Sequence, residues 1–182
     1  TATIYAATKE KAQTESEGVI GDGFSVEIAK TWEAAFNAAV VDESVRKITL
    51  RTTLVMGDEK GTVLDVLSGL ARKYLGGKMG DGSQMVSWID INDVCRVVEW
   101  MIANEAASGA YNLAAPEALT NAEMMKRIRE RAGVRFGLPA SEWMLEVGAF
   151  FMRTETELIL KSRWVYPERL MEAGFVFEKE EF

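Results

Sequence analysis

The sequence predicts an α/β protein with a largely parallel sheet, followed by a mostly helical C-terminal region. Strand-like and helix-like segments alternate as far as about residue 133, and such alternation implies crossover connections between parallel strands. Hydrophobic residues make up 48% of the 182 residues and charged residues 27%, which is typical of a globular protein. We therefore expect two parts, residues 1–133 with the sheet and residues 134–182 with the helical region.

The first third of the chain contains two predicted strands and one predicted helix. Residues 1–5 resemble a strand, and the polar, glycine-bearing residues 7–23 are predicted to form a loop. Apolar residues then recur at helical spacing from Ser25 onward, with Ser25 or Asp22 as the expected cap and one face expected to be buried. The residues at 47–56 are rich in β-branched side chains and predict a strand.

The middle of the chain continues this alternation. The expected elements are a helix over 63–74, a glycine-dense loop over 76–83, a strand over 86–91, a helix that begins at Asn92 or Asp93, and a strand over 110–114. The loop is either a flexible turn or a place where backbone approaches something closely. The second of these helices is expected to bury Cys95 as an inert side chain.

The last third begins with a clear helix signal. Thr120 and Glu123 have the spacing of a capping box, and the helix that they open is expected to end at Gly133. Beyond it, residues 138–182 are aromatic and are expected to be mostly helical, with Pro167 at the start of one more helix.

Charge and composition exclude several classes of function. The net charge is −7 and no block of basic residues occurs, so nucleic-acid binding has no electrostatic support. No apolar run reaches the roughly 18 residues that a membrane span needs, so we expect a soluble, cytoplasmic protein. The absence of histidine excludes histidine-based triads, and Asp90 with Asp93 supply too few ligands for a metal, so no metal site is expected.

Several segments, in order, resemble a known family. They are TATIY at 1–5, Gly23-Phe24, Trp32-Glu33, LRTTLVMG at 50–57, SWIDINDV at 87–94 and AYNL at 110–113, followed by LP at 138–139, ELILKS at 157–162, PERL at 167–170 and EAGF at 172–175. Together they are similar to the second half of extended short-chain dehydrogenases/reductases, in the nucleoside-diphosphate-sugar epimerase-like branch that carries a C-terminal domain of unknown function.

This resemblance implies the second half of a Rossmann-like, doubly wound parallel sheet, with a mostly helical C-terminal region. A full-length family member is expected to use NAD or NADP and to bind a small molecule such as a sugar nucleotide. The dinucleotide-binding motif needs glycines at a strand-to-helix turn, and this chain has none in that arrangement. We therefore expect a piece of a larger protein that binds no cofactor by itself.

The resemblance also implies roles for individual residues. Thr1 falls on the catalytic hydroxyl position, and Lys30 is the candidate for the lysine that comes after the catalytic tyrosine, but Phe24, Ser25 and Val26 occupy the possible tyrosine positions. The residues expected at the substrate are Tyr5, Phe24, Arg51, Gln84 and Trp88, and those expected at the cofactor are Thr52 and Thr53. Arg51 either contacts a phosphate or carboxylate or forms a surface ion pair, and Trp88 lies either in the pocket or in the core.

The functional expectation is the substrate side of an NAD(P)-dependent epimerase or dehydratase, inactive as this fragment. The alternative is a non-catalytic module that binds a ligand or a regulatory partner on the same scaffold. The edge of a half sheet recruits other chains, so we also expect a homodimer through that edge or through the aromatic tail.

Overall fold

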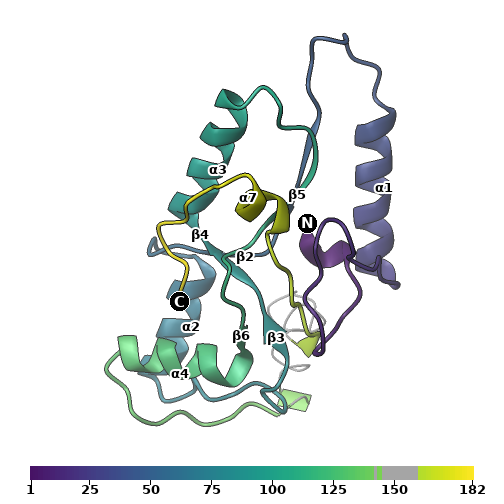
Figure 1. Cartoon of the computed structure of the whole chain (residues 1–182). Helices are drawn as coiled ribbons and strands as arrows, with labels where there is room; N and C mark the ends of the chain where they lie inside the picture. The colour runs from purple at the N-terminus through teal and green to yellow at the C-terminus, as the bar shows by residue number, and fades with distance from the viewer. Residues whose placement is uncertain (142, 145–159) are drawn as a thin grey trace.

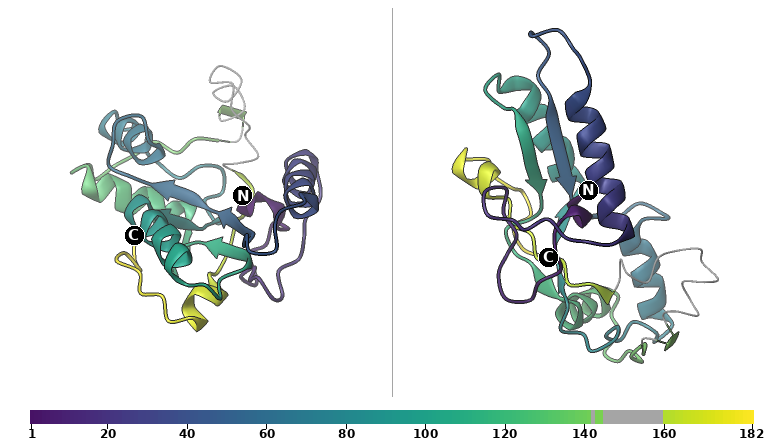
Figure 2. Two further views of the ribbon diagram at one scale, coloured as in Figure 1. Left: turned by 90° about the horizontal axis from the view of Figure 1, so that it is seen from above. Right: turned by 90° about the vertical axis from the view of Figure 1, so that its right-hand side faces the viewer.

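The computed structural model of the chain describes residues 1–141, 143–144 and 160–182. Its α/β arrangement agrees with the prediction, and the described strands form three two-stranded pairings, two of them parallel and one antiparallel. The elements are η1 (Ala2–Ile4), α1 (Phe24–Ala38), β1 (Ile48–Thr52), β2 (Leu54–Met56), α2 (Val63–Arg72), β3 (Met85–Val86), β4 (Trp88–Asp90), α3 (Ile91–Ala103), β5 (Gly109–Leu113), β6 (Leu119–Thr120), α4 (Asn121–Arg131) and α7 (Glu168–Glu172). Figures 1 and 2 show α1 on one side of the molecule and α2 with α4 on the other.

The strand predicted over 47–56 is bent at Thr53 into two strands. β1 pairs in parallel with β5, and β2 pairs in parallel with β4. At the bend, both the backbone N–H and the hydroxyl of Thr53 donate to the carbonyl of Leu113, at 3.0 and 2.7 Å. The hydroxyl therefore fixes the point at which the chain changes its pairing partner.

The strand predicted over 86–91 is likewise divided, at Ser87, into β3 and β4. β3 pairs in antiparallel fashion with β6. The Ser87 N–H donates to the carbonyl of Arg163 at 2.9 Å, and the Val165 N–H donates to the Ser87 hydroxyl at 2.7 Å. An extended C-terminal segment therefore lies beside this division.

The N-terminal strand expected over 1–5 is not formed. Residues Ala2–Ile4 form a turn of 3-10 helix, and the backbone N–H of Thr3 donates to the Thr1 hydroxyl at 3.3 Å. Tyr5 alone forms an antiparallel bridge, with Ile20 on the far side of the loop. Strand propensity was overridden here by a local side-chain cap.

Helix α1 begins at Phe24, and its cap is neither of the two predicted residues, Asp22 and Ser25. Gly23 holds the cap position with φ of 96°, and no side chain bonds the first turn. The expected burial of one face applies to Val26 and Ala29, whereas Trp32 is 65% exposed. The C-terminal half of the helix therefore keeps its apolar side chains at the surface.

Helix α3 begins at Ile91 because the Asp90 carboxylate accepts the backbone N–H of Asn92 at 2.9 Å. The predicted cap at Asn92 or Asp93 is therefore wrong. The predicted burial of Cys95 is also wrong, since its side chain is exposed. Asp93, Val97 and Met101 are buried at four-residue intervals, and a helix places Cys95 away from that face.

Two other local predictions are confirmed. Thr120 and Glu123 form the capping box, and α4 ends just before Gly133. In the glycine-dense loop, a Cβ added at Gly77 would lie 2.4 Å from the backbone of Leu138. Of the two interpretations of the loop, the close approach of another backbone segment is therefore the one that holds at Gly77.

The described C-terminal residues are not mostly helical. Residues 160–166 include bridges at Arg163 and Val165, and α7 comes next as a short helix, with Pro167 at its cap. Figure 1 shows this segment, in yellow, passing from the neighbourhood of β3 to α7. Residues 145–152 of the aromatic run, with Leu158 and Ile159, lie outside the described residues.

Two large hydrophobic clusters form the core. One joins β2, β4, α2 and α4, and includes Trp88 and Ile128. The other joins β4, β5 and α3 to the C-terminal residues Leu170, Phe175 and Phe177. The C-terminal segment thus shares its core with the sheet. In the described part of the chain, no helix has both the length and the apolar character needed to cross a bilayer.

Candidate functional site

A cavity of about 190 Å³ lies where β1 ends and the chain bends into β2. Its walls come from the N-terminal turn, from the bend between β1 and β2, from β3 and from the C-terminal segment. The lining residues are Thr1, Ala2, Thr3, Thr52, Thr53, Leu54, Met85, Val86, Ser87, Lys161 and Arg163. We call it the threonine cavity. Ligands of open α/β sheets bind outside the carboxyl ends of strands, which is where this cavity lies.

Three of the residues singled out from the sequence meet in the threonine cavity, namely Thr1, Thr52 and Thr53. Thr1 is exposed, and its hydroxyl lies 3.0 Å from the hydroxyl of Thr3. The hydroxyl of Thr53 is already donated to the backbone. Thr1 therefore presents the more available hydroxyl of the two, whereas Thr53 positions backbone.

A second cavity, of about 370 Å³, adjoins Tyr5 and the loop before α1. It is lined by Tyr5, Ala6, Ala7, Ile20, Gly21, Asp22, Val26, Lys161 and Arg163. We call it the loop cavity. Lys161 and Arg163 line both cavities, so the two adjoin along the C-terminal segment.

Tyr5 is held at the centre of a buried polar network. Its hydroxyl donates to the Asn112 side-chain oxygen at 2.9 Å and accepts from the Arg51 guanidinium at 2.8 Å. Burial raises the pKa of Tyr5, and this effect outweighs the opposing effect of the nearby Arg51. Tyr5 is therefore a neutral phenol at physiological pH.

Arg51 forms a two-pronged ion pair with Glu33 on α1, with nitrogen-to-oxygen distances of 2.9 and 2.8 Å. The hydrogen bonds to Glu33 raise the pKa of Arg51 despite partial burial. The side chains of Arg51 and Glu33 are only 13% and 17% exposed. Of the two readings of Arg51, the ion pair is present, but it is largely enclosed rather than at the surface.

The other residues expected on α1 lie outside both cavities. Lys30 is exposed and pairs with Glu27 at 2.8 Å, and Phe24 is 75% exposed. Neither lines the threonine cavity or the loop cavity. The structure therefore does not bring Lys30 to the cavity that contains Thr1, and its catalytic role stays a prediction.

Gln84 and Trp88 are interior residues. Gln84 is 3% exposed, and its amide donates to the Met79 carbonyl at 3.0 Å. Trp88 is 2% exposed and packs edge-to-face on Phe182, with ring centroids 5.0 Å apart. Trp88 therefore lies in the core, which is one of the two positions predicted for it.

Lys161 and Arg163 were not predicted as site residues. The sequence signal for them was limited to the C-terminal stretch with Lys161, which resembles the family. Their meeting with Thr1 depends on contacts between residues more than 150 positions apart, such as that of Arg163 with the Tyr5 carbonyl, at 3.4 Å.

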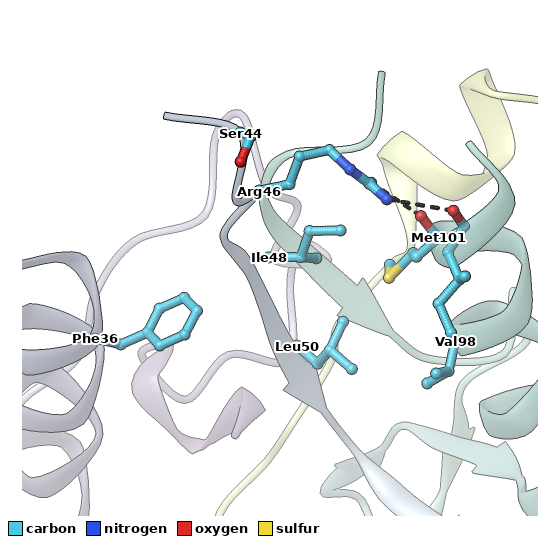
Figure 3. A pocket seen from close by; sticks show the side chains of 8 residues that line it. Phe36, Ser44, Arg46, Ile48, Leu50, Val98 and Met101 are labelled. Atoms are coloured by element: carbon cyan, nitrogen blue, oxygen red, sulfur yellow. Dashed lines mark hydrogen bonds between the residues drawn. The ribbon is translucent and has the colours of Figure 1, made fainter. Parts of the chain in front are cut away.

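A third cavity lacks the chemistry of a catalytic site. It measures about 480 Å³ and lies between α1, β1 and α3, with Phe36, Leu50 and Val98 among its walls (Figure 3). Its one charged side chain, Arg46, donates to the carbonyls of Met101, Ile102, Asn104 and Ala107. Arg46 therefore stabilises the C-terminal end of α3 and the turn after it. Within the described residues, no group of three or more candidate metal ligands occurs.

Comparison with known proteins identifies two sequence regions. The profile of the NAD dependent epimerase/dehydratase family matches residues 1–114, and that of a domain of unknown function, DUF1731, matches residues 140–181. Epimerase family protein Mb2239 of Mycobacterium bovis is 30% identical over 173 residues, which cover 95% of this chain and 56% of that protein. Human epimerase family protein SDR39U1 is 29% identical, over 90% of this chain and 54% of its own length. The chain thus spans about half the length of these curated relatives.

Solved structures share the fold. The crystal structure of human SDR39U1 with NADPH matches with a TM-score of 0.86 and 26% identity, over 98% of this chain and 59% of that one. The nucleoside-diphosphate sugar epimerase from Corynebacterium glutamicum matches with a TM-score of 0.76 and 27% identity, over 99% of this chain and 33% of that one. The fold is therefore the Rossmann-like α/β fold expected from the sequence. With the profile match over more than half of its length, the chain belongs to the NAD-dependent epimerase/dehydratase family.

Proposed function

We propose that this chain is the substrate side of an NAD(P)-dependent epimerase or oxidoreductase that acts on nucleoside-diphosphate sugars. A longer polypeptide would supply the half that holds the dinucleotide. The names of two similar structures support this, since one contains NADPH and the other is a nucleoside-diphosphate sugar epimerase. The observation that carries the proposal is the threonine cavity at the carboxyl end of β1.

The size of the threonine cavity suits one end of a dinucleotide rather than the whole molecule. Ligand pockets usually measure about 300–1,000 Å³, and this cavity measures about 190 Å³. Its hydroxyl and backbone groups can hydrogen-bond the nicotinamide end, and Thr52 and Thr53 are the residues of this chain that would contact that end. When bound, the cofactor supplies or accepts a hydride.

Thr1 is the residue of this chain that would contact the reacting oxygen of the substrate. Its exposed hydroxyl can donate to a carbonyl oxygen or accept from an alcohol, and so orient that oxygen in the cavity. Phe24 cannot carry a proton, and Lys30 is paired with Glu27 elsewhere on α1. The chain by itself is therefore proposed to be inactive.

The alternative function is a ligand-binding or regulatory module without turnover. The observation that favours it is the separation of Lys30 from the threonine cavity. The two candidates differ in one measurable respect, because an enzyme transfers hydride whereas a binding module only takes up cofactor or ligand.

The test uses the longer protein with nucleotide sugars as substrates. It follows the absorbance of reduced nicotinamide and also the epimerised sugar, because an epimerase returns the hydride and leaves no net reduced cofactor. Thr1→Val keeps the side-chain volume and removes the hydroxyl, so we expect a loss in kcat/KM of about 100-fold. Thr31→Val is the matched control, because Thr31 lies on α1 and its hydroxyl donates to the Glu27 carbonyl. Cofactor uptake without hydride transfer in the unmodified protein would reject the enzyme in favour of the binding module.

A further inference from the structure

Cations gather at the C-terminal end of α4, although the chain as a whole is acidic. Residues 126–135 hold five of the 21 lysine and arginine residues in a chain whose net charge is −7. Two of the five face carboxylates of other elements, since Arg127 pairs with Glu117 at 2.8 Å and Arg131 pairs with Asp58 at 2.6 Å. The other three line one cavity; they are Lys126, Arg129 and Arg135.

This cavity, which we call the α4 cavity, measures about 460 Å³ and is as large as many small-molecule sites. Besides the three cations, its walls are Glu130, Gly133 and Val134, so Val134 is its one hydrophobic side chain. None of these residues lines the threonine cavity or the loop cavity. Figure 1 shows α4 on the side of the molecule away from α1. The α4 cavity is therefore separate from the candidate site.

Backbone contacts hold the wall that carries Arg135. The N–H of Gly77 donates to the carbonyl of Leu138 at 3.0 Å. At Gly137, a Cβ would lie 2.7 Å from the backbone carbonyl carbon of Gly76, so a larger residue would not fit there. The segment that leads from α4 to Leu138 is therefore fixed against the glycine-dense loop without any ligand.

The three cations keep most of their hydrogen-bonding capacity. Arg129 is half-buried and donates through one nitrogen to the Gly76 carbonyl at 2.7 Å, which fixes the side chain. Lys126 lies 3.8 Å from the Glu130 carboxylate, and both side chains are more than 60% exposed, so this pair is weak. Arg135 forms no hydrogen bond or ion pair with another described residue through its side chain. Each cation can therefore still donate to a ligand.

Cations near a helix end also have a structural explanation, because that end carries about half a negative charge. In α4, backbone groups already satisfy this end. The Ala132 N–H donates to the Ile128 carbonyl at 3.0 Å, and the Val134 N–H donates to the Arg129 carbonyl at 2.9 Å. Three cations also exceed the charge of the helix end together with the Glu130 carboxylate, so positive charge is left facing the cavity.

We propose that the α4 cavity binds a small polyanion whose phosphate or carboxylate groups contact Lys126, Arg129 and Arg135. Ammonium and guanidinium groups form strong, charge-assisted hydrogen bonds to such oxyanions, and the guanidinium fork matches their geometry. A single hydrophobic wall residue favours a ligand made mainly of charged groups over one with a large ring system. The inference goes beyond the proposed function, because the α4 cavity shares no residue with the threonine cavity.

The test measures binding of two probes, inorganic pyrophosphate and citrate, by calorimetry at constant ionic strength. Arg135→Gln removes one charged contact, so the affinity for the favoured probe should fall about tenfold, and Lys126→Gln should act in the same direction. Arg72→Gln is the matched control, because Arg72 is an exposed arginine in the last turn of α2 and does not line the α4 cavity. Thermal unfolding checks that every variant is folded.

The outcomes identify the anion and decide the proposal. Weaker binding of pyrophosphate in Arg135→Gln and Lys126→Gln, with unchanged binding in Arg72→Gln, identifies a phosphate ligand. The same pattern with citrate identifies a carboxylate ligand. Equal affinities in Arg135→Gln and Arg72→Gln, or no saturable binding of either probe to the unmodified chain, would overturn the proposal. Hydride transfer does not enter the measurement, so the proposed enzyme function can fail without changing this result.

Discussion

The carboxylate of Asp93 accepts the backbone N–H of Lys179 at 3.0 Å, across 86 positions of sequence. Its other oxygen accepts the N–H of Glu178 at 2.9 Å and pairs with Arg96 at 2.7 Å. Asp93 is fully buried. A residue at the start of α3 therefore fastens the C-terminal segment to the sheet.

Replacement of Asp93 by alanine should lower the free energy of unfolding by about 3 kcal/mol, because it leaves two partly buried backbone N–H groups and the Arg96 guanidinium without this acceptor. The measurement is urea unfolding followed by circular dichroism. Asp58→Ala is the control, since Asp58 pairs with Arg131 at the surface, and its loss should cost less than about 1 kcal/mol. Equal effects of the two variants would show that Asp93 does not hold the C-terminal segment.

Tyr5→Phe removes the hydroxyl that joins Arg51 to Asn112. Both partners then lose a hydrogen bond in a buried setting, so we expect a loss of about 1–3 kcal/mol in the free energy of unfolding. Tyr74→Phe makes the same chemical change at a side chain that is 58% exposed, and it should alter stability by less than about 0.5 kcal/mol. The account of the network is wrong if both variants unfold at the same denaturant concentration.

Glu15 should make stability depend on pH. Burial raises the pKa of its carboxyl above the ordinary value of 4.5, although its oxygen accepts the Asn112 N–H at 2.8 Å. The folded state therefore favours the protonated form. Ionisation costs stability as the pH rises from 4.5 through the raised pKa, and below 4.5 the cost disappears. As the pH rises from 4.5 through the raised pKa, the unmodified protein should therefore lose stability relative to Glu15→Gln.

Glu123 supplies a control of opposite sign. The hydrogen bonds from Thr120 lower the pKa of Glu123 below 4.5. Its ionised form therefore stabilises the protein above pH 4.5, and this contribution is lost as the pH falls through the lowered pKa. Urea unfolding from pH 3 to about 8 compares the unmodified chain with Glu15→Gln and with Glu123→Gln. Parallel curves for Glu15→Gln and the unmodified chain would contradict the burial argument.

The chain should self-associate when it is studied alone. On one side β1 pairs with β5, and on the other its Leu50 carbonyl lies 3.5 Å from the Thr1 amino group, so much of that edge lacks a strand partner among the described residues. Light scattering should report a dimer at high concentration. Trp32→Glu places a charge on the exposed face of α1, which is not one of the two predicted contacts. Dimers that persist in this variant would therefore point to the strand edge or to the aromatic tail, residues 138–182. A monomer at every concentration would contradict the prediction.

Some signals that act within a few residues were read correctly from the sequence. The capping box of Thr120 and Glu123 and the spacing of apolar residues in α2 depend only on neighbours, and both elements formed as predicted. The cap of α3 was misplaced because Asp90, Asn92 and Asp93 all suit that position, and the contacts with residues 178 and 179 that engage Asp93 were not visible locally.

The candidate site was predicted only in part, because some of its contacts join residues that are far apart in the sequence. Thr1, Thr52 and Thr53 came from the family resemblance, and the structure places them around one cavity. Arg163 reaches the site because it forms a parallel bridge with Val86 of β3, and no periodicity in the sequence specifies that partner. The position of Trp88 was left open between the pocket and the core, because a tryptophan in a strand suits either.

The most direct test of the central claim is a titration of NADPH, monitored by its fluorescence, into residues 1–182 and into the longer protein. The central claim is that this chain holds the substrate, while another segment supplies most of the contacts to the dinucleotide. It predicts micromolar affinity for the longer protein and no saturable binding to residues 1–182. Micromolar binding of NADPH to residues 1–182 alone would contradict it.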